Sequence, residues 1–346
     1  MKTKIFLITL TTLLVSACST APQKQQAPEW LNGSSTKFPA ALYLTGQGNA
    51  TELNDAKDRA RSDLAKQFEV AMQERSLQSQ EYSRTQQQGE VVESLDQQVS
   101  RNISSYTSRI LQGVEIGEQW RDKSSKQHHV LAVLSRSRAQ QKFEQDIDAL
   151  DNNSEQKIKQ AETQTDPLTK AGLIQQAIEA QQQRLAAQSS LQVVDNSGRG
   201  KPPTLILAEL ERNRDAIING IKLATGASGE YQNDLQQQIG SAASAAGFFL
   251  DEANADYTLT VTTKLDPAIL QQGWYWLRGT LELNMKDKTD KDVGVKRWPI
   301  KASSTTLEQT RQRLLDDTNI ILAQEMRSAV LGFALVTESV TKKQTP

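Results

Sequence analysis

Apolar side chains recur every three or four positions along several stretches of the chain, which places them on one face of a helix. This spacing predicts helices over residues 53–71 and 92–106. It also predicts two longer helices over residues 136–161 and 168–191, which Thr165-Asp166-Pro167 separates. The longer pair resembles a lone tetratricopeptide-like hairpin. Because no second copy follows it, a rigid spacer is its favoured role.

Apolar and polar residues alternate in other segments, with the period of a half-buried strand. Residues 40–48 predict a short strand that ends at glycines. Residues 110–121 and 126–134 predict a hairpin around a polar turn. The second strand of this hairpin is apolar on both of its faces, so we expect it to be covered on both sides.

The C-terminal part of the chain predicts seven elements. They are a helix at 204–219, a strand at 221–225, a helix at 230–246, strands at 255–265, 273–286 and 293–303, and a helix at 305–335. After the opening helix the order is β-α-β-β-β-α, which is typical of an antiparallel sheet with helices on one face.

Together these elements predict the α+β fold class, with two small α+β modules joined by a long αα-hairpin. The expected boundaries are 29–136 for the first module, 137–194 for the hairpin, 195–203 for a linker and 204–340 for the second module. The linker is identified by its glycines and by Pro202-Pro203, which combine flexibility with helix breaking.

The N-terminus has the pattern of a secretory signal. Residues 1–17 combine a basic start, an apolar run too short to span a bilayer as a mature helix, and small residues before Cys18. Residues 18–28 are polar and contain two prolines, which is typical of a flexible tether. Cys18 is the only cysteine, so no disulfide or thiol active site remains for the body of the protein.

The segment around Cys18 resembles the lipobox of bacterial lipoproteins. That resemblance implies that Cys18 is the first mature residue and carries acyl chains such as palmitate, and several such chains anchor a protein essentially permanently. Ser19 follows the cysteine, where an aspartate would indicate inner-membrane retention in enteric-type bacteria. The resemblance therefore implies the outer membrane, with the body facing the periplasm.

Charge changes the picture of possible partners. Removal of residues 1–17 takes Lys2 and Lys4 from the 40 basic side chains, which leaves 38 against 41 acidic ones. This balance argues against nucleic acid, or an anionic lipid surface, as the main partner.

Three motifs in a fixed order resemble one known family. They are Pro28-Glu29-Trp30, then Tyr43-Leu44-Thr45-Gly46-Gln47-Gly48, then a helix with Ala56, Arg59, Ala60, Asp63, Leu64, Ala65 and Lys66. Together they resemble the twenty-kilodalton lipoprotein antigen family over about residues 28–138. The resemblance implies an α+β module without known catalysis, in outer-membrane lipoproteins that include members needed for flagellar motility. The chain continues for some 200 residues beyond this module, so a flagellar role is only partly implied.

A search for reactive residues finds no complete set. His128 and His129 are adjacent on a predicted strand, so they point to opposite faces and do not share a metal ion. The Gly198-Arg199-Gly200-Lys201 segment departs from a phosphate-binding loop, because Pro202 lacks both a hydroxyl and a backbone donor. Gly226-Ala227-Ser228-Gly229 likewise departs from a nucleophile elbow. We therefore expect no catalytic residue, no metal site and no cofactor.

The aromatic cluster Trp274-Tyr275-Trp276 is the strongest candidate binding feature. Tyr275 belongs to the apolar face of its strand, so Trp274, Trp276 and Arg278 share the opposite face. Tryptophan and arginine are enriched in binding hot spots. The alternative is that this face packs against Trp298, the helical hairpin or the first module.

These observations lead to two hypotheses about function. The first is a non-catalytic outer-membrane lipoprotein that acts through protein contacts in an envelope or surface-structure assembly, with flagellar proteins among the expected partners. The second is a periplasmic module that binds peptidoglycan or glycan, or that activates a cell-wall synthase, through the C-terminal domain. That hypothesis draws on an analogy of element order with small envelope domains. The glutamine-rich stretch 181–188 either lines a homo-oligomer or stays solvated.

Overall fold

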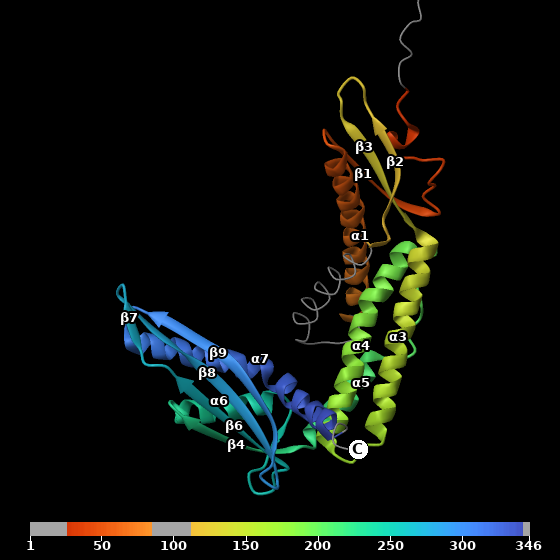
Figure 1. Ribbon diagram of the computed structural model, residues 1–346. Helices are drawn as coiled ribbons and strands as arrows, with labels where there is room; N and C mark the ends of the chain where they lie inside the picture. The colour runs from red at the N-terminus through yellow and green to blue at the C-terminus, as the bar shows by residue number, and fades with distance from the viewer. Residues whose placement is uncertain (1–25, 85–111, 342–346) are drawn as a thin grey trace, which may run out of the picture. The chain divides into compact units, whose positions relative to one another are not determined.

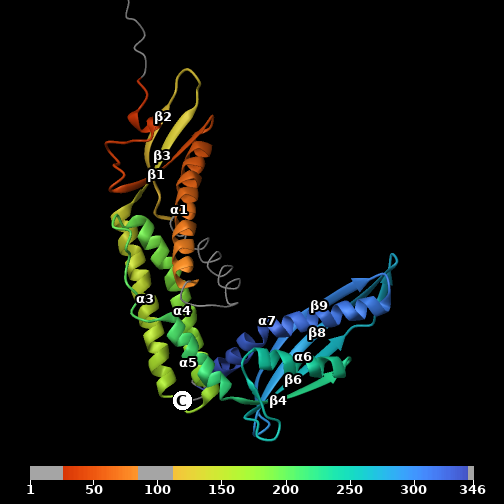
Figure 2. The same ribbon diagram turned by 180° about the vertical axis from the view of Figure 1, so that it is seen from behind.

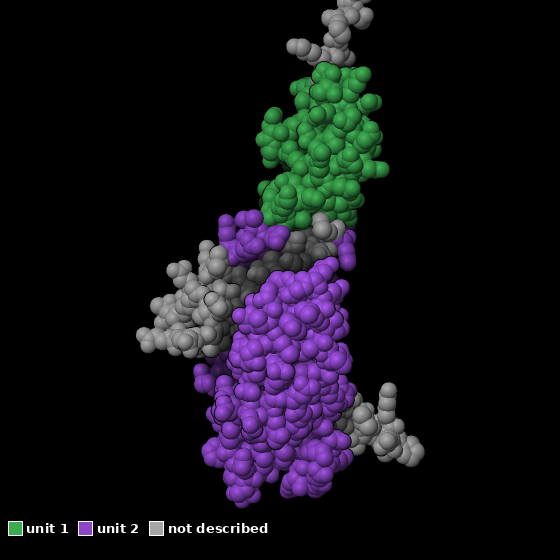
Figure 3. Space-filling view, turned by 90° about the vertical axis from the view of Figure 1, so that its left-hand side faces the viewer, with its two compact units in different colours: residues 1–67, 113–135 green, residues 68–112, 136–346 purple. Residues whose placement is uncertain are grey.

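The computed structural model describes residues 26–84 and 112–341 of the chain. Cys18, the signal segment and the helix predicted over 92–106 lie outside these residues. The chain divides into two compact units, which Figure 3 colours separately. Unit 1 consists of residues 1–67 and 113–135, and unit 2 consists of residues 68–112 and 136–346.

Unit 1 contains a three-stranded antiparallel sheet with the order β1-β3-β2 (Figure 1). Its strands are β1 (Tyr43–Ala50), β2 (Glu115–Arg121) and β3 (His128–Ser135), preceded by a short 3-10 helix, η1 (Glu29–Asn32). The β2–β3 hairpin predicted from the sequence is confirmed. Its turn is held by Asp122, because Ser124 and Ser125 donate hydrogen bonds to the carboxylate and lower its pKa to about 2.

Strand β3 is covered on both faces, as its sequence predicts, and residues Val130 to Leu134 are all buried. On one face, Leu131 and Val133 form a cluster with the indole of Trp30, which is 2% exposed. The other face of the sheet packs against helix α1 (Leu53–Arg84), and Gly46 and Gly48 of the neighbouring strand β1 lie on this face. The segment around Trp30 is thus a structural part of unit 1.

The two glycines of β1 permit this close packing. A Cβ atom added to Gly48 would lie 2.2 Å from the backbone nitrogen of Ala60, and one added to Gly46 would lie 2.5 Å from that of Leu64. Real Cβ atoms do not approach a backbone nitrogen so closely. The strand and the helix therefore meet backbone to backbone, with only the small side chains of Ala56 and Ala60 between them.

Helix α1 also satisfies the outer edge of β1. β1 pairs only with β3, so alternate backbone groups on its other side have no strand partner in this sheet. The carboxylate of Asp63 accepts a hydrogen bond from the Gln47 backbone N–H at 2.9 Å. Arg59 donates to the carbonyl oxygen of Asn49 at 2.8 Å. Two charged side chains of α1 therefore take the place of a further strand.

Unit 2 begins with the helical hairpin, and both of its predicted helices are confirmed. They are α3 (Arg136–Glu162) and α4 (Pro167–Val194), followed by α5 (Leu207–Asn219). The Asp166 carboxylate caps α4 by accepting a hydrogen bond from the Thr169 backbone N–H at 2.7 Å, and Pro167 occupies the first helical turn.

A buried polar cluster joins the two helices of the hairpin. The Arg184 side chain is 2% exposed, and its Nε atom donates to Asp151 Oδ1 at 2.7 Å. Gln181 donates to the same carboxylate at 3.0 Å and to Ser154 Oγ at 2.9 Å. Gln181 is therefore neither solvated nor free to line a pore, which corrects the expectation for its part of the 181–188 stretch.

The same arginine reaches the segment that follows α4. Its Nη2 atom donates to the carbonyl oxygens of Lys201 and Pro202, at 3.2 and 3.0 Å. Residues 195–203 have no helix or strand, as predicted, but this end of the segment is fixed to the hairpin.

The C-terminal part of unit 2 is a six-stranded sheet with two helices (Figures 1 and 2). Its elements are β4 (Lys222–Gly229), α6 (Gln232–Ala245), β5 (Phe249–Leu250), β6 (Tyr257–Leu265), β7 (Ile269–Gln271), β8 (Trp274–Asp287), β9 (Asp292–Ser304) and α7 (Leu307–Thr341). The strand order is β5-β4-β6-β8-β7, and β9 pairs with β8.

This sheet differs from the predicted one in two respects. β4 runs parallel to both β5 and β6, so the sheet is mixed rather than wholly antiparallel. The reason is that α6 lies between β4 and the next strands and returns the chain to the starting end of the sheet. The two- and three-residue strands β5 and β7 are also additions that the alternation pattern did not reveal.

Helices α6 and α7 cover one face of the sheet and share one apolar core with it. The residues alternating along β6 and β8 supply the sheet side of this core, as the sequence predicts: Tyr257, Leu259, Val261, Leu277, Leu281, Leu283 and Met285. The helical hairpin joins the same core through Leu168 and Ala171. The α+β class is therefore confirmed. Within the part of the chain that the structure describes, no helix is long and apolar enough to cross a membrane.

Tyr257 fixes the end of the hairpin to the sheet. Its hydroxyl donates a hydrogen bond to the carboxylate of Asp166, the residue that caps α4. Burial, this hydrogen bond and the nearby negative charge raise the pKa of the Tyr257 hydroxyl well above its usual value, so it stays protonated and remains a donor.

Strand β9 is an edge of the sheet, because among the described strands it pairs only with β8. It carries Pro299, which lacks a backbone donor, and the exposed residues Lys296, Arg297 and Lys301. Prolines in sheets are found on edge strands.

We predict that Gly48→Ala destabilises unit 1 by about 1–3 kcal/mol, because the added methyl group overlaps the α1 backbone. Urea unfolding followed by tryptophan fluorescence measures the change. Gly332→Ala is the matched control. Gly332 lies inside α7 with open space around it, so its substitution should leave stability unchanged or raise it. Equal effects of the two substitutions would contradict the packing described here.

We predict that Arg184→Ala lowers the free energy of unfolding by about 3–5 kcal/mol, because it leaves the Asp151 carboxylate buried without its cation. Thermal and urea unfolding measure the loss. The double variant Arg184→Met, Asp151→Leu should recover much of it. Lys142→Ala breaks an exposed ion pair with Asp146 and should cost under about 1 kcal/mol. A small loss in Arg184→Ala would show that the cluster does not hold the hairpin.

Candidate functional site

The aromatic residues singled out from the sequence lie on the sheet face opposite α6 and α7, which we call the open face. Trp276 is half-buried there, Arg278 is exposed, and Trp274 is 44% exposed. Trp298 pairs in register with Leu281 and therefore lies on the helix-covered face. The expected packing of this cluster against Trp298 is thus wrong, because the register puts the two on opposite sides of the sheet.

Two cations lie against the ring of Trp276. The Lys301 Nζ atom is 4.8 Å from the ring centroid, and the Arg278 guanidinium carbon is 5.7 Å from it. Both distances are within the range of cation–π attraction. We refer to Arg278 and Lys301 as the cation pair.

The cation pair is unusual because its members are directly opposite each other on β8 and β9. Like charges at opposite positions of a sheet repel, which destabilises the pairing of the strands. Neither residue forms an ion pair with a carboxylate in the described parts of the chain. Attraction to the Trp276 ring offsets part of the repulsion.

Other cations on the open face are paired in the ordinary way. Glu282 accepts hydrogen bonds from Arg297 at 2.7 Å and from Lys264 at 3.1 Å. These hydrogen bonds, from Arg297 first and then from Lys264, lower the pKa of the Glu282 carboxyl. The cation pair differs from these cations, because no carboxylate contacts either of its members in the described parts of the chain.

Next to the cation pair, the β7–β8 hairpin displays apolar side chains. Its two-residue turn, Gln272-Gly273, has positive φ at both positions (52° and 78°), as a tight hairpin requires. Ile269 is 53% exposed and Leu270 is 60% exposed. We call Ile269, Leu270 and Trp274 the apolar tip. The sequence analysis missed β7, although the Gln-Gly pair before Trp274 was the available signal.

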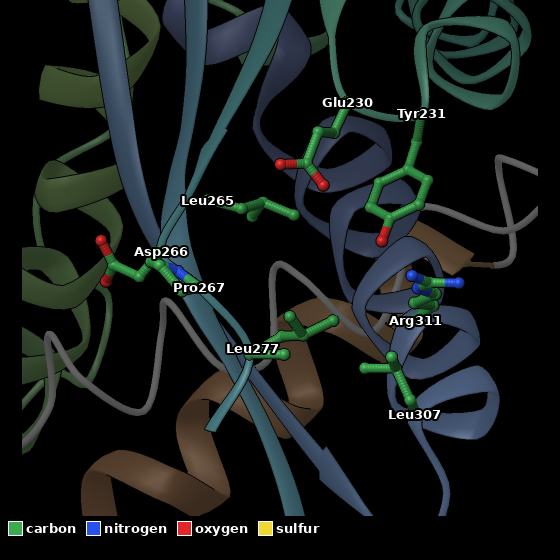
Figure 4. A pocket seen from close by; sticks show the side chains of 9 residues that line it. Glu230, Tyr231, Leu265, Asp266, Pro267, Leu277, Leu307 and Arg311 are labelled. Carbon is green, nitrogen blue, oxygen red and sulfur yellow. The ribbon is translucent and has the colours of Figure 1, made fainter. Parts of the chain in front are cut away.

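A cavity of about 260 Å³ lies on the helix-covered side of the sheet, near the ends of β4 and β6. Leu265, Leu277 and Leu307 line part of it, and the hydroxyl of Tyr231 faces the guanidinium of Arg311 at its rim (Figure 4). Burial raises the pKa of the Tyr231 hydroxyl, while the Arg311 charge opposes that effect. The other side chains at the rim are the carboxylates of Glu230 and Asp266, and Asp266 points away from the cavity.

The lining of this cavity contains no serine, cysteine, histidine or lysine. Its ionisable side chains are those of Glu230, Tyr231, Asp266 and Arg311. Among the described residues, no group of three or more histidine, cysteine, aspartate or glutamate side chains is arranged to hold a metal ion.

The two histidines lie on β3 and point to opposite faces, as expected. The His129 ring lies 5.3 Å from that of Trp120, its cross-strand neighbour on β2. Trp120 packs against the cluster around Trp30 and is a structural residue of unit 1.

Comparison with known proteins shows that the first module is similar to a family of bacterial lipoproteins. Residues 28–135 match the model of the LPP20 lipoprotein family. This match confirms the resemblance to the twenty-kilodalton lipoprotein antigen family, and it ends at the last residue of β3. A search of the curated proteins found no match to the chain.

Solved structures give distant matches. A secreted protein of Helicobacter pylori aligns over 82% of this chain and 97% of its own, with 11% identity and a TM-score of 0.41. A minor lipoprotein of Acinetobacter baumannii covers 31% of this chain and 90% of its own, with 18% identity and a TM-score of 0.27. Rare lipoprotein B of Shewanella oneidensis aligns over 35% of this chain and 98% of its own, with 14% identity and a TM-score of 0.24.

We predict that Trp276→Ala and Trp274→Ala differ in their effects on stability. Trp276 is half-buried and offsets the repulsion of the cation pair, so its loss should cost about 1–3 kcal/mol. Trp274 is more exposed, so its loss should cost about 0.5 kcal/mol or less. Urea unfolding compares the two variants. A larger effect of Trp274→Ala would contradict the placement of these rings.

Proposed function

We propose that this protein is a non-catalytic lipoprotein of the outer membrane, anchored through Cys18 and facing the periplasm. In this proposal it acts through protein contacts in an envelope or surface-structure assembly, of which the flagellum is one candidate. The observation that carries the proposal is the LPP20 family match over residues 28–135, placed directly behind a lipobox and a short polar tether.

The construction of the described part of the chain supports a role in binding rather than in catalysis. Its charged groups are used for structure: Asp63 and Arg59 complete the edge of β1, and Arg184 and Asp151 hold the helical hairpin. Its exposed apolar residues lie at several places on the surface, and three of them, Ile269, Leu270 and Trp274, lie together at the β7–β8 hairpin. A surface of this kind binds a partner and offers no reactive group to a substrate.

The alternative of a C-terminal module that stacks on a glycan fits the geometry less well. Stacking needs an open aromatic face, whereas Lys301 and Arg278 already lie against the Trp276 ring. Trp274 alone would offer a single exposed ring. We therefore retain protein contacts as the proposed mode of action.

Acylation is tested by growing cells with labelled palmitate and isolating the protein. The wild-type protein should carry the label and sediment with the outer membrane, because several acyl chains hold it in a bilayer. The Cys18→Ser variant should lose both the label and the membrane association. An unlabelled wild-type protein, or a labelled one in the inner membrane, would contradict the proposal.

The role in assembly is tested with a strain that lacks the gene. We expect a defect in motility or in resistance to detergents and bile-type compounds. The wild-type gene should restore it, and the Cys18→Ser gene should not. Cross-linking in intact cells should recover an envelope protein with the wild-type chain. Normal motility, normal resistance and no cross-linked partner would together refute the proposed role.

A further inference from the structure

The β7–β8 hairpin and the cation pair lie together at one end of the C-terminal sheet, as Figures 1 and 2 show for β7 and β8. Ile269 pairs in register with Trp276, and Trp276 is two residues from Arg278 on the same face. The apolar tip and the cation pair are therefore continuous parts of one surface.

The apolar tip is exposed on both faces of the hairpin. Ile269 and Trp274 lie on the open face, whereas Leu270 pairs with Tyr275 and lies on the helix-covered side. A protein partner that packs on one face of the sheet would leave the residues of the other face in water. An apolar medium that surrounds the hairpin accepts both sets, and the interfacial region of a bilayer is such a medium.

Along β8 the side chains change in the order in which a bilayer surface changes with depth. Trp274 belongs to the apolar tip, Trp276 follows, and Arg278 comes about 13 Å from Trp274 at the usual rise per residue. Aromatic rings are favoured at the level of lipid headgroups, and basic side chains at the level of phosphates. Gln271 at the end of β7 and Gln272 in the turn are polar but uncharged, so entry would stop in the headgroup region.

A third cation lies near the cation pair. Arg313 donates to the carbonyl oxygen of Ser303, which is the register partner of Trp276, and so adds a third cation. Asp266 is the acidic group beside Arg278, where its backbone N–H donates to the Arg278 carbonyl oxygen. Arg278, Lys301 and Arg313 thus place three cations at this end of the sheet, although the whole chain is close to neutral.

We propose that the apolar tip and the cation pair bind the surface of an anionic phospholipid bilayer. The near-neutral net charge argues against a membrane as the main partner, and this contact is accordingly local and weak. It rests on the proposed function for its place in the cell, where a chain already tethered to a membrane needs little additional affinity. The cost of placing Arg278 opposite Lys301 then has a use, because lipid phosphates bridge the two charges.

The test uses the mature chain from residue 18 onward with Cys18→Ser, so that no acyl chain contributes. Vesicles of phosphatidylethanolamine and phosphatidylglycerol, and vesicles of phosphatidylcholine alone, are sedimented with the protein at low salt. We expect binding to the anionic vesicles and little binding to phosphatidylcholine. Binding to the anionic vesicles should be lost in about 0.5 M salt, because salt screens the attraction between the cations and the lipid phosphates. Equal binding to both vesicles, or to neither, would overturn the proposal.

Two pairs of variants locate the contact. Arg278→Gln with Lys301→Gln should weaken binding about 30-fold, at about fivefold per cation. Lys264→Gln with Arg297→Gln removes the same charge from the same face, but from the cations that Glu282 holds, and should change binding far less. Equal losses in the two double variants would show that only the total charge matters and would refute the site.

The apolar tip has its own variant and control. Ile269→Thr with Leu270→Thr should weaken binding by about tenfold, because two side chains no longer leave water. Val295→Thr, at an exposed position of β9, should not change it. Circular dichroism checks that each variant is folded. Two further results would overturn the proposal: retention on purified peptidoglycan in place of vesicles, and a dimer in sedimentation equilibrium that the Ile269, Leu270 variant abolishes.

Failure of this test is distinguishable from failure of the proposed function. The vesicle experiment does not depend on acylation, and palmitate labelling does not depend on the hairpin. A labelled protein whose body ignores anionic vesicles would refute the membrane contact and leave the lipoprotein proposal intact.

Discussion

The buried ion pair between Arg184 and Asp151 is the interaction on which the arrangement of unit 2 depends. One guanidinium joins α3 to α4 and also binds the carbonyl oxygens of Lys201 and Pro202. The chain then continues into α5 and the C-terminal sheet. At the turn of the hairpin, Asp166 caps α4 and accepts the hydrogen bond of Tyr257. The hairpin is thus held by charged residues within its helices and at its turn. Arg184 is buried, so it must stay paired to do so.

Unit 1 explains in physical terms why its motif has the residues it has. The glycines of β1 are needed because α1 lies against the backbone of the strand, and the alanines of α1 are needed for the same reason. Asp63 and Arg59 belong to the motif because they satisfy the free edge of β1. Gln47 donates to the carbonyl oxygen of Trp30 at 2.6 Å, which ties the first motif to the second. The glycines, the alanines, Gln47, Arg59 and Asp63 of the motif therefore have packing or hydrogen-bonding roles.

The sequence allowed the long helices, the hairpin of unit 1 and the alternating core of β6 and β8 to be predicted, because their periods extend over many residues. The parallel pairing of β4 could not be predicted from the sequence, because the alternation of apolar and polar residues does not show the direction of the partner strand. The register that separates Trp298 from Trp276 was also hidden, because it depends on where β8 and β9 pair. The same limit applies to the cation pair: Arg278 and Lys301 are 23 positions apart, and only the sheet makes them neighbours. Strand β7 has three residues, which is too short for a period to appear.

The composition of β9 has a consequence for crowding. Proteins held at high local density meet one another repeatedly, and an unpaired strand with free backbone groups is a template on which a second sheet can grow. Pro299 removes one donor from that edge, and Lys296, Arg297 and Lys301 place positive charge along it. Two such edges repel each other before their backbones come within bonding distance. The strand that closes this sheet is therefore built so that neighbouring copies stay separate and do not aggregate through it.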